Sequence, residues 1–363
     1  MKIRILKNNL LNAIQTTQNI VSPKITLPIL GNILIETQNN TLKLITTDLD
    51  VGISCEVPVD IQEKGAITIP AKKFSDIIKE LPNEDIDITV KKNNLVEIEC
   101  GKCRFKLMGL PKDEFPKFPE FTDKEIINIE QVVFKEMLDL TSFAVSHEET
   151  RYILNGILVE FRDNGIKLVA TDGHRLALSE KKLNASFPKE FNMIIPIKAI
   201  NELNRNLKNE GDIQITISTN QVLFNIDNIL IVSRLIEGAF PNYQQVIPPP
   251  LEKKIKINRL DFLAAIRRAN LLTTPDFQAI KLEIFKNKMV VSKSTPDVGE
   301  SREELDIEYA GKELISGFNP HYLIDALKNL KEEFLFFELS EPDKPGVIRT
   351  ANYLYLVMSI TRI

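Results

Sequence analysis

Hydrophobic and polar positions along the chain follow the same order three times. Each copy opens with a short alternating run, the pattern of a half-buried strand, and passes directly into apolar residues at helical spacing. The three openings are Ile3–Ile14, Ile127–Leu138 and Ile255–Ile266, offset by 127 − 3 = 124 and 255 − 127 = 128 residues. Self-similarity at a long fixed period predicts repeated structural units. We therefore expect a strand followed by a helix at each place.

A second helical pattern lies later in each copy. Its apolar residues fall at i, i+3 or i+4, and i+7, which is the buried stripe of an amphipathic helix. The three segments are Pro70–Leu81, Pro196–Leu207 and Asn319–Leu330. Alternating strand patterns follow them at Ile86–Val90, Ile213–Ile217 and Phe334–Leu339.

A third marker is a strand that ends in Thr-Asp. It occurs as Leu42–Asp48 and Ile166–Asp172, at a spacing of 172 − 48 = 124, whereas the third copy near Met289–Ser292 lacks the Thr-Asp. Proline-rich segments close the first two copies at 115–121 and 240–250. Proline fixes φ and removes a backbone donor, so these segments predict extended connectors.

The repeat predicts an α+β fold of three domains, each with two helices packed on antiparallel sheets. We place these domains at residues 1–123, 124–250 and 251–363. Units of roughly 120 residues are much longer than the 20–50 residues of stacked solenoid repeats, which disfavours a solenoid.

Composition adds limits on the class of protein. The 363 residues are 43% hydrophobic and 26% charged, as in ordinary globular chains. No apolar run is long enough to predict a membrane span, and the first residues lack the pattern of a signal peptide. Three cysteines give no disulfide framework, so we expect a cytoplasmic protein.

The net charge of −4 argues at first against nucleic acid as a partner. With cuts after residues 123 and 250, the thirds carry 16 − 17 = −1, 13 − 16 = −3 and 17 − 17 = 0 charges, so no third is basic. The predicted helices nevertheless gather basic and amide side chains, as at Lys72-Lys73, and no acid precedes Glu36. Ordinary solvated helix faces are the alternative, because acids such as Asp76 lie on the same helices.

Motifs for catalysis are weak. The histidines His147, His174 and His321 have no metal-ligand spacing, and no phosphate-binding glycine loop occurs. Asp172-Gly173-His174 could belong to a hydrolase, but no nucleophile elbow accompanies it, and Asp-Gly is typical of a turn. Cys100-Gly-Lys-Cys103 lies between two alternating runs, which favours a hairpin turn over a metal or redox site.

Six segments together resemble the bacterial DNA polymerase III β subunits, the sliding clamps. They are Thr26–Asn32, Thr47–Leu49, Arg151–Gly156, Ala170–Ala177, Phe240–Tyr243 and Gly317–Asn319. The resemblance extends from end to end and includes the threefold repeat.

This resemblance implies the DNA clamp fold and a head-to-tail homodimeric ring of six domains around double-stranded or primed DNA. Lys and Arg on the helices would contact phosphates, which carry no sequence information, so the ring could slide. The implied partners are the replicative polymerase α subunit, the clamp-loader δ subunit, other polymerases and repair proteins. No catalytic residue, cofactor, metal or membrane is implied. A clamp paralogue specialised for repair or drug resistance remains an alternative, as does a hydrolase using Asp172 and His174.

Two surfaces follow from the resemblance. A partner-peptide cleft between the second and third domains would take short linear motifs in an apolar slot. Its residues would be Leu154, Thr171, Gly173, His174, Arg175, Leu176, Pro241, Val246, Phe277, Asn319, Tyr322, Val357, Met358, Ser359, Ile360 and Arg362. The DNA-contacting residues would be Lys24, Lys72, Lys73, His147, Tyr152 and Lys198.

The chain departs from the family pattern at its end. Met358-Ser359-Ile360-Thr361-Arg362, which would form the far wall of the cleft, has one residue more than the usual ending and lacks its proline. Gln245 stands where many relatives have a base, and Lys24 replaces a frequent Arg, which keeps the charge but loses the planar fork.

Overall fold

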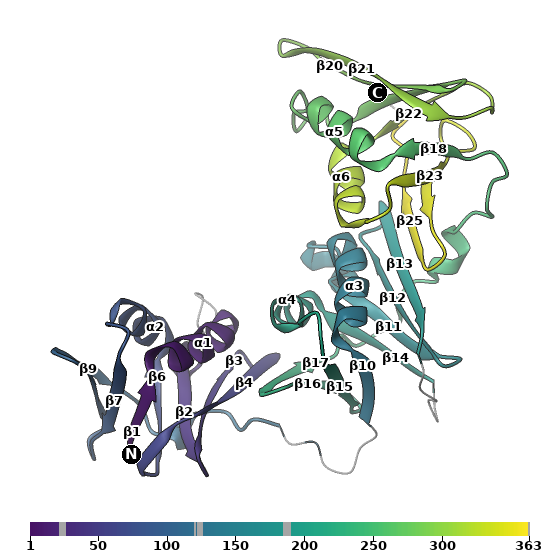
Figure 1. The fold of residues 1–363 in the computed structure, drawn as a ribbon. Helices are drawn as coiled ribbons and strands as arrows, with labels where there is room; N and C mark the ends of the chain where they lie inside the picture. The colour runs from purple at the N-terminus through teal and green to yellow at the C-terminus, as the bar shows by residue number, and fades with distance from the viewer. Residues whose placement is uncertain (22–26, 120, 122–125, 184–189, 362–363) are drawn as a thin grey trace. The chain divides into compact units, whose positions relative to one another are not determined.

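The computed structural model describes residues 1–21, 27–119, 121, 126–183 and 190–361. The chain divides into two compact units (Figure 1). The first unit combines residues 1–133 with 198–235, and the second combines 134–197 with 236–363.

Two antiparallel sheets form the first unit. Its strands are β1 (Lys2–Leu6), β2 (Asn32–Gln38), β3 (Thr41–Thr47), β4 (Val51–Pro58), β5 (Asp60–Glu63), β6 (Ala66–Pro70), β7 (Asp85–Val90), β8 (Leu95–Cys100), β9 (Cys103–Met108), β10 (Ile126–Glu130), β15 (Asp212–Ile217), β16 (Gln221–Ile226) and β17 (Ile229–Arg234). One sheet has the strand order β5-β1-β7-β8-β9, and the other has the order β10-β15-β16-β17-β4-β3-β2-β6.

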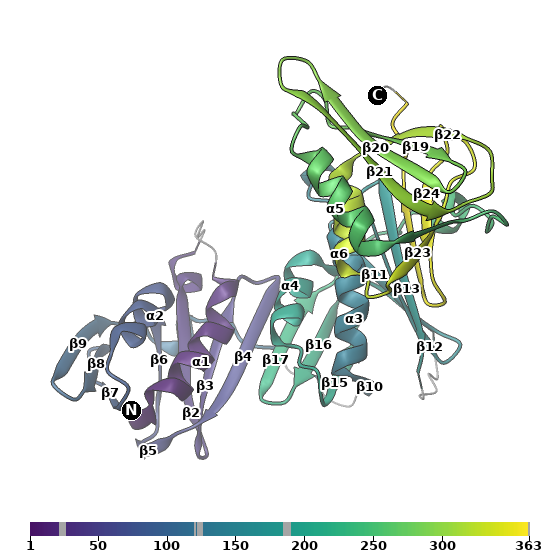
Figure 2. The ribbon, with the colours of Figure 1, turned by 45° about the horizontal axis from the view of Figure 1, so that its top comes forward.

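The helices of the first unit bury the stripes that the sequence predicts. α1 (Lys7–Thr17) buries Leu10, Ala13 and Ile14, and it contacts α2 (Ala71–Glu80), as both ribbon views show (Figures 1 and 2). α2 buries Phe74 and Ile78 and leaves its polar side exposed. α4 (Ile197–Asn206) begins at the boundary between the units and continues into the first.

A single twelve-stranded sheet forms the second unit. Its strands are β11 (Gly156–Arg162), β12 (Gly165–Thr171), β13 (Arg175–Lys182), β14 (Phe191–Pro196), β18 (Ile255–Asn258), β19 (Ile280–Phe285), β20 (Lys288–Thr295), β21 (Gly299–Glu308), β22 (Leu314–Phe318), β23 (Phe334–Glu338), β24 (Gly346–Arg349) and β25 (Tyr353–Val357). Their order is β14-β11-β12-β13-β25-β24-β23-β18-β21-β20-β19-β22.

Two helices of the second unit begin at asparagine caps. The Asn258 side chain accepts hydrogen bonds from two backbone N–H groups at the start of α5 (Arg259–Asn270). The Asn319 side chain accepts one such bond at the start of α6 (Pro320–Asn329). Such caps satisfy donors that have no partner inside the helix. α5 and α6 contact each other, and α3 (Gln131–Thr141) runs from the first unit into the second.

Short 3₁₀ turns connect these elements. They are η1 (Gln18–Ile20), η2 (Pro28–Gly31), η3 (Lys112–Glu114), η4 (Ser142–Ala144), η5 (Glu149–Leu154) and η6 (Tyr243–Val246). The prolines predicted an extended connector at 240–250. Because η6 lies inside this segment, the connector is extended only in part. Two-residue loops such as Gly101-Lys102 close hairpins, which confirms the hairpin expected between Cys100 and Cys103.

Strand pairing repeats with the sequence. The strand before the first helix of each copy pairs with the strand after the second helix, as β1 with β7, β10 with β15, and β18 with β23. The hairpins β3–β4, β12–β13 and β20–β21 are likewise equivalent. These pairings confirm the predicted fold class of three repeats, each with two helices and antiparallel strands. The domain limits at residues 123 and 250 stay a prediction.

Adjacent repeats share a sheet through one further pairing. β4 of the first repeat pairs with β17 of the second, and β13 of the second pairs with β25 of the third. Within the described residues, no helix is long and apolar enough to cross a membrane.

Candidate functional site

A tight turn joins β12 to β13 at Thr171–Arg175. One oxygen of the Asp172 carboxylate accepts the backbone N–H groups of His174 at 2.9 Å and of Arg175 at 3.0 Å. The Thr171 hydroxyl donates to the Arg175 carbonyl at 2.6 Å and accepts the N–H of Gly173 at 3.1 Å. Short polar side chains that bond their own backbone favour turns, so the turn predicted from Asp-Gly is confirmed.

Glycine is required in this turn. Gly173 has φ +90°, a conformation that residues with a Cβ rarely adopt. A Cβ at this position would also lie 2.8 Å from Nη1 of Arg151, which donates to the Asp172 carbonyl at 2.9 Å.

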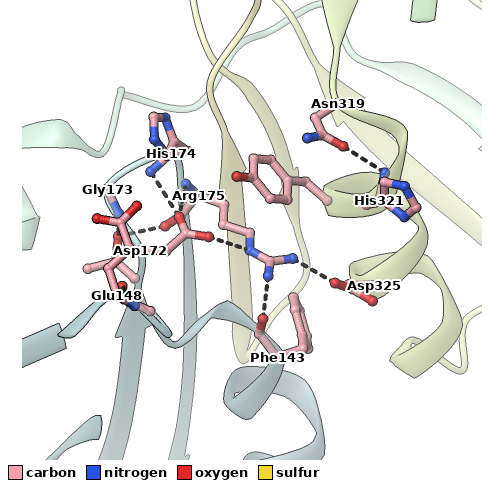
Figure 3. Close-up of polar contacts among 12 residues, drawn as sticks. Phe143, Glu148, Asp172, Gly173, His174, Arg175, Asn319, His321 and Asp325 are labelled. Carbon is pink, nitrogen blue, oxygen red and sulfur yellow. Dashed lines mark hydrogen bonds and ion pairs between the residues drawn. The ribbon is translucent and has the colours of Figure 1, made fainter. Parts of the chain in front are cut away.

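The Arg175 side chain is the polar centre of the site (Figure 3). Its Nε donates to Asp172 at 2.9 Å, and its Nη1 donates to Asp325 of α6 at 2.8 Å. Its Nη2 donates to the Phe143 carbonyl at 2.5 Å, in the turn after α3. The residue is 8% exposed, and its guanidinium also lies 4.5 Å from the centre of the Tyr322 ring. Arg175 therefore holds three separate segments together.

The two carboxylates compensate the buried charge of Arg175. Burial alone would raise the pKa of Asp325, but hydrogen bonds from Arg175 and Lys328 outweigh it and lower that pKa below its usual range. Burial also raises the pKa of the Tyr322 hydroxyl, which keeps that group neutral. The result is an ordered ion-pair network with one face made of aromatic rings.

Part of the predicted cleft gathers around this network. The His174 ring stacks against Tyr322, with ring centres 6.4 Å apart and planes inclined by 19°. The N–H of Met358 donates to the His174 carbonyl at 2.8 Å, which extends the β13–β25 pairing of Arg175 with Val357. Met358 is 44% exposed, so its side chain is available beside the turn.

The predicted apolar slot has both buried and exposed members. Leu176 and Val357 are 2% and 0% exposed, so they are core residues beneath the surface. Leu176 belongs to an apolar cluster against which Ile153, Phe240 and Ile247 pack. Of their chain neighbours in the predicted slot, Leu154 is partly buried, Pro241 is exposed and Val246 is 55% exposed.

The other predicted cleft residues lie on separate segments. Phe277 is half exposed in the loop after α5, and Nζ of Lys293 lies 5.9 Å from the centre of its ring. Asn319 caps α6 with its side chain and accepts the N–H of His321 at 2.9 Å. Ser359 is partly buried, and the Ile360 N–H bonds the Gly317 carbonyl at 2.8 Å. Arg362 lies outside the described residues.

The predicted DNA-contacting residues belong to both units. Lys72 and Lys73 are exposed in the first turn of α2, which contains no acid. Lys198 pairs with the Asp48 carboxylate and donates to the Ile20 carbonyl at 3.3 Å, so part of its charge is compensated. His147 and Tyr152 are exposed in the second unit. Lys24 lies outside the described residues.

Sequence reasoning missed the supports of this site. Asp325 and Phe143 hold Arg175, yet they lie 150 and 32 residues from it along the chain. Tyr355 also supports the site, because its hydroxyl donates to the Tyr322 carbonyl at 2.8 Å. A lone acid on the polar side of a predicted helix gives no signal of its distant partner.

The geometry does not resemble a hydrolytic centre. The Asp172 carboxylate faces backbone N–H groups and Arg175, whereas a catalytic aspartate would orient the ring of its histidine. His174 instead presents its ring to Tyr322. Among the described residues, no group of three or more His, Cys, Asp or Glu side chains could hold a metal ion. A rigid polar turn beside half-exposed apolar side chains is instead suited to binding a short peptide.

Comparisons with known proteins agree along the whole chain. Residues 1–119, 128–242 and 244–361 match the families described as the N-terminal, central and C-terminal domains of the DNA polymerase III beta subunit. The beta sliding clamp of Chlamydia pneumoniae is 32% identical over 361 residues, which cover 99% of this chain and 98% of that protein.

Solved structures show the same similarity. The DNA polymerase sliding clamp from Bacillus subtilis superposes with a TM-score of 0.96 at 32% identity, and 100% of each chain is covered. A sliding clamp from Bartonella birtlesii bound to griselimycin gives a TM-score of 0.95 at 33% identity, also with full coverage of both chains.

Proposed function

This chain belongs to the DNA polymerase III beta subunit family, the bacterial sliding clamps, and we propose that two copies close head to tail around duplex DNA and hold replication proteins through the cleft at Arg175. It is a sliding clamp and not an enzyme, as the family is a non-catalytic processivity factor. The alternatives of a specialised paralogue and of a hydrolase are not favoured. We place the protein in the cytoplasm with the DNA.

Two unpaired strand edges support the head-to-tail dimer. β4, β13 and β21 are equivalent strands that begin at Val51, Arg175 and Gly299, with spacings of 175 − 51 = 124 and 299 − 175 = 124. The first two pair with β17 and β25 of the following repeat. Within the described chain, β21 pairs over residues 299–306 with β20 alone, and β9 pairs with β8 alone. β9 of a second copy is therefore the natural partner of β21.

The repeat also predicts the register of this seam between copies. Ile229 of β17 lies opposite Cys55, and Tyr353 of β25 lies opposite Ser179. Cys103 occupies the equivalent place in β9, because it follows its two-residue hairpin loop as Ile229 does. By this equivalence Cys103 of one copy lies opposite Glu303 of the other.

Exposed apolar side chains on β9 and one opposed pair of unlike charges support the pairing of the two edges. β9 carries Arg104 and Lys106 and exposes Phe105 and Met108, at 39% and 60%. β21 carries the acids Glu300, Glu303 and Glu304 and the base Arg302, and the proposed register sets Lys106 opposite Glu300. Long edge strands with exposed apolar side chains normally need a cover, and a second copy supplies one here. A head-to-tail contact of this kind closes into a ring where its rotation permits.

DNA binding rests on helix surfaces rather than on net charge. Lys72 and Lys73 expose two positive charges in a helical turn that carries no acid. We propose that Lys24, Lys198, His147 and Tyr152 also contact DNA. Because phosphate contacts are independent of sequence, such a surface binds any duplex and lets it slide.

We propose the Arg175 site as the docking point for short linear motifs of the replicative polymerase, the clamp loader and other polymerases or repair proteins. The Thr171–Arg175 turn supplies rigid polar groups, and Leu154, Val246, Phe277 and Met358 supply apolar surface that is at least partly exposed. The griselimycin-bound relative supports a ligand site on clamps of this family.

The observation that carries the proposal is the end-to-end match to clamps together with the two unpaired equivalent strands. The test is retention on DNA after loading by a clamp loader. The protein should remain on nicked circular DNA and be released when the circle is linearised. Equal retention on linear and circular DNA would contradict topological encirclement.

A further inference from the structure

Two cysteines face each other at the end of the β8–β9 hairpin. Cys100 and Cys103 are direct cross-strand partners, joined by the loop Gly101-Lys102, in which Gly101 has φ +53°. Directly opposed residues of an antiparallel pair project to the same face, with Cβ atoms about 4.5–5.5 Å apart. A disulfide needs about 3.5–4.5 Å between Cβ atoms, so a small approach of the two strands would allow the bond.

The two thiols differ in access to solvent. Cys100 is 1% exposed and its Sγ lies 3.6 Å from the Pro82 carbonyl, whereas Cys103 is partly exposed. Lys102 and the exposed Arg104 flank Cys103, and Arg104 forms an ion pair with Glu99. Burial, with a smaller effect from Glu84, raises the pKa of the Cys100 thiol. An oxidant would therefore react first at Cys103.

The surroundings of the two cysteines do not favour a metal site. Structural zinc needs about four ligands, and the described residues contain no group of three or more suitable side chains. Both cysteines are free thiols in the structure. Opposed free thiols with unequal exposure instead match an attacking and a resolving cysteine.

We propose that Cys100 and Cys103 form a reversible thiol–disulfide site that responds to glutathione disulfide. The Cys103 thiolate attacks one sulfur of glutathione disulfide and releases one glutathione thiolate. The Cys100 thiolate then attacks the Cys103 sulfur of the mixed disulfide and releases the second glutathione. Two protein thiols are oxidised to one disulfide, one glutathione disulfide is reduced to two glutathione molecules, and the protons pass to the thiolates that leave.

Oxidation of the two cysteines should weaken the contact between two copies. This expectation rests on the proposed head-to-tail dimer. Cys103 is the first residue of β9 and would lie opposite Glu303 of the second copy. Drawing Cys103 toward β8 moves it away from that strand. We expect the dimer dissociation constant to rise about fivefold, the effect of losing about one backbone hydrogen bond.

Mass spectrometry tests the site directly. The purified full-length protein is incubated with glutathione and glutathione disulfide at several ratios, at low and high protein concentration, and alkylated after denaturation. We expect the number of alkylated thiols to fall from three to one, with a loss of two hydrogens. Trypsin cuts after Lys102, so the fragments 93–102 and 103–104 should stay joined until they are reduced.

Single variants separate the steps. Cys100→Ser should leave Cys103 carrying one glutathione, and Cys103→Ser should leave the buried Cys100 unmodified. Cys55 is the internal control, because burial raises the pKa of its thiol to about 11 and no cysteine lies opposite it on β17.

The outcomes distinguish this site from the proposed ring. Three free thiols at every ratio and concentration, or a bond to Cys55, would overturn the redox site. An oxidised protein with an unchanged dimer constant would overturn only the coupling to the seam. A protein that forms the internal disulfide but never dimerises would contradict the proposed ring and leave the redox site standing.

Discussion

Replacing Asp325 with asparagine tests the ion-pair network around Arg175. The change keeps the size of the side chain and removes its charge, while Arg175 retains Asp172 and the Phe143 carbonyl. The side chains of Arg175 and Asp325 are 9% and 26% exposed, so water compensates poorly for the lost partner.

The expected cost follows from this burial. A hydrogen bond to a charged group contributes about 1.5–3 kcal/mol. Removing one partner of a fully buried pair costs about 3–5 kcal/mol. Because Asp172 still faces Arg175, we expect Asp325→Asn to lower the free energy of unfolding of the second unit by about 2 kcal/mol.

The assay is urea denaturation followed by far-UV circular dichroism, since the chain has no tryptophan. The matched control is Asp227→Asn, which removes an exposed ion pair with Lys208 in the first unit and should change little. Equal stability of Asp325→Asn and the wild type, or an equal loss in the control, would refute the network as a source of stability.

The pH dependence has a definite sign. The pKa of Asp325 is lower in the folded protein than in the unfolded chain, where an aspartate has a pKa of about 3.9. Its contribution is therefore fully present above that unfolded value, and it is lost as the pH falls through the lower folded pKa. The stability gap between the wild type and Asp325→Asn should close over that acid range, and a gap that widened there would contradict the assignment.

Three further predictions address the proposed surfaces. Lys72→Glu should weaken DNA binding and reduce the slope of log affinity against log salt concentration by about one or more. The control Lys286→Glu, in the exposed turn between β19 and β20, should leave that slope unchanged. Phe277→Ala should weaken binding of a polymerase-derived peptide at least about tenfold in a fluorescence titration, as expected for an anchor residue, whereas the equally exposed Phe334→Ala should not. Lys106→Glu places an acid opposite Glu300 of β21 in the proposed register and should raise the dimer dissociation constant at least about tenfold in analytical ultracentrifugation, with Phe334→Ala again as the control; a dimer unaffected by Lys106→Glu would count against the seam.

Periodicity predicted most of the fold because each element buries one regular stripe. Pro70–Leu81 became α2, and its apolar positions Phe74 and Ile78 are fully buried. Ile86–Val90 became β7, where Ile86 and Ile88 alternate into the core. The register between distant strands was beyond such reasoning, because alternation fixes which face a residue takes but does not identify its partner.

The candidate site was predictable only in part for the same reason. The Thr171–Arg175 turn is local, so Asp-Gly signalled it correctly. The apolar slot depended on tertiary burial, and Leu176 and Val357 prove to be core residues that shape the surface from beneath. Resemblance to a family names positions without saying which of them reach solvent.

The repeat explains why a chain of this length would assemble with a copy of itself. Each repeat offers one strand edge to the repeat that follows, and the chain satisfies this pairing twice, at β4–β17 and β13–β25. When three repeats pair in this way, two strand edges stay unpaired among the described residues. They are the edge of β21 in the third repeat and the edge of β9 in the first. Neither can be satisfied by adding residues to the ends, because a further repeat would only move the open edge along. In the proposed ring, closure by a second copy would pair both edges at once, and the same contact would enclose the space where DNA would lie.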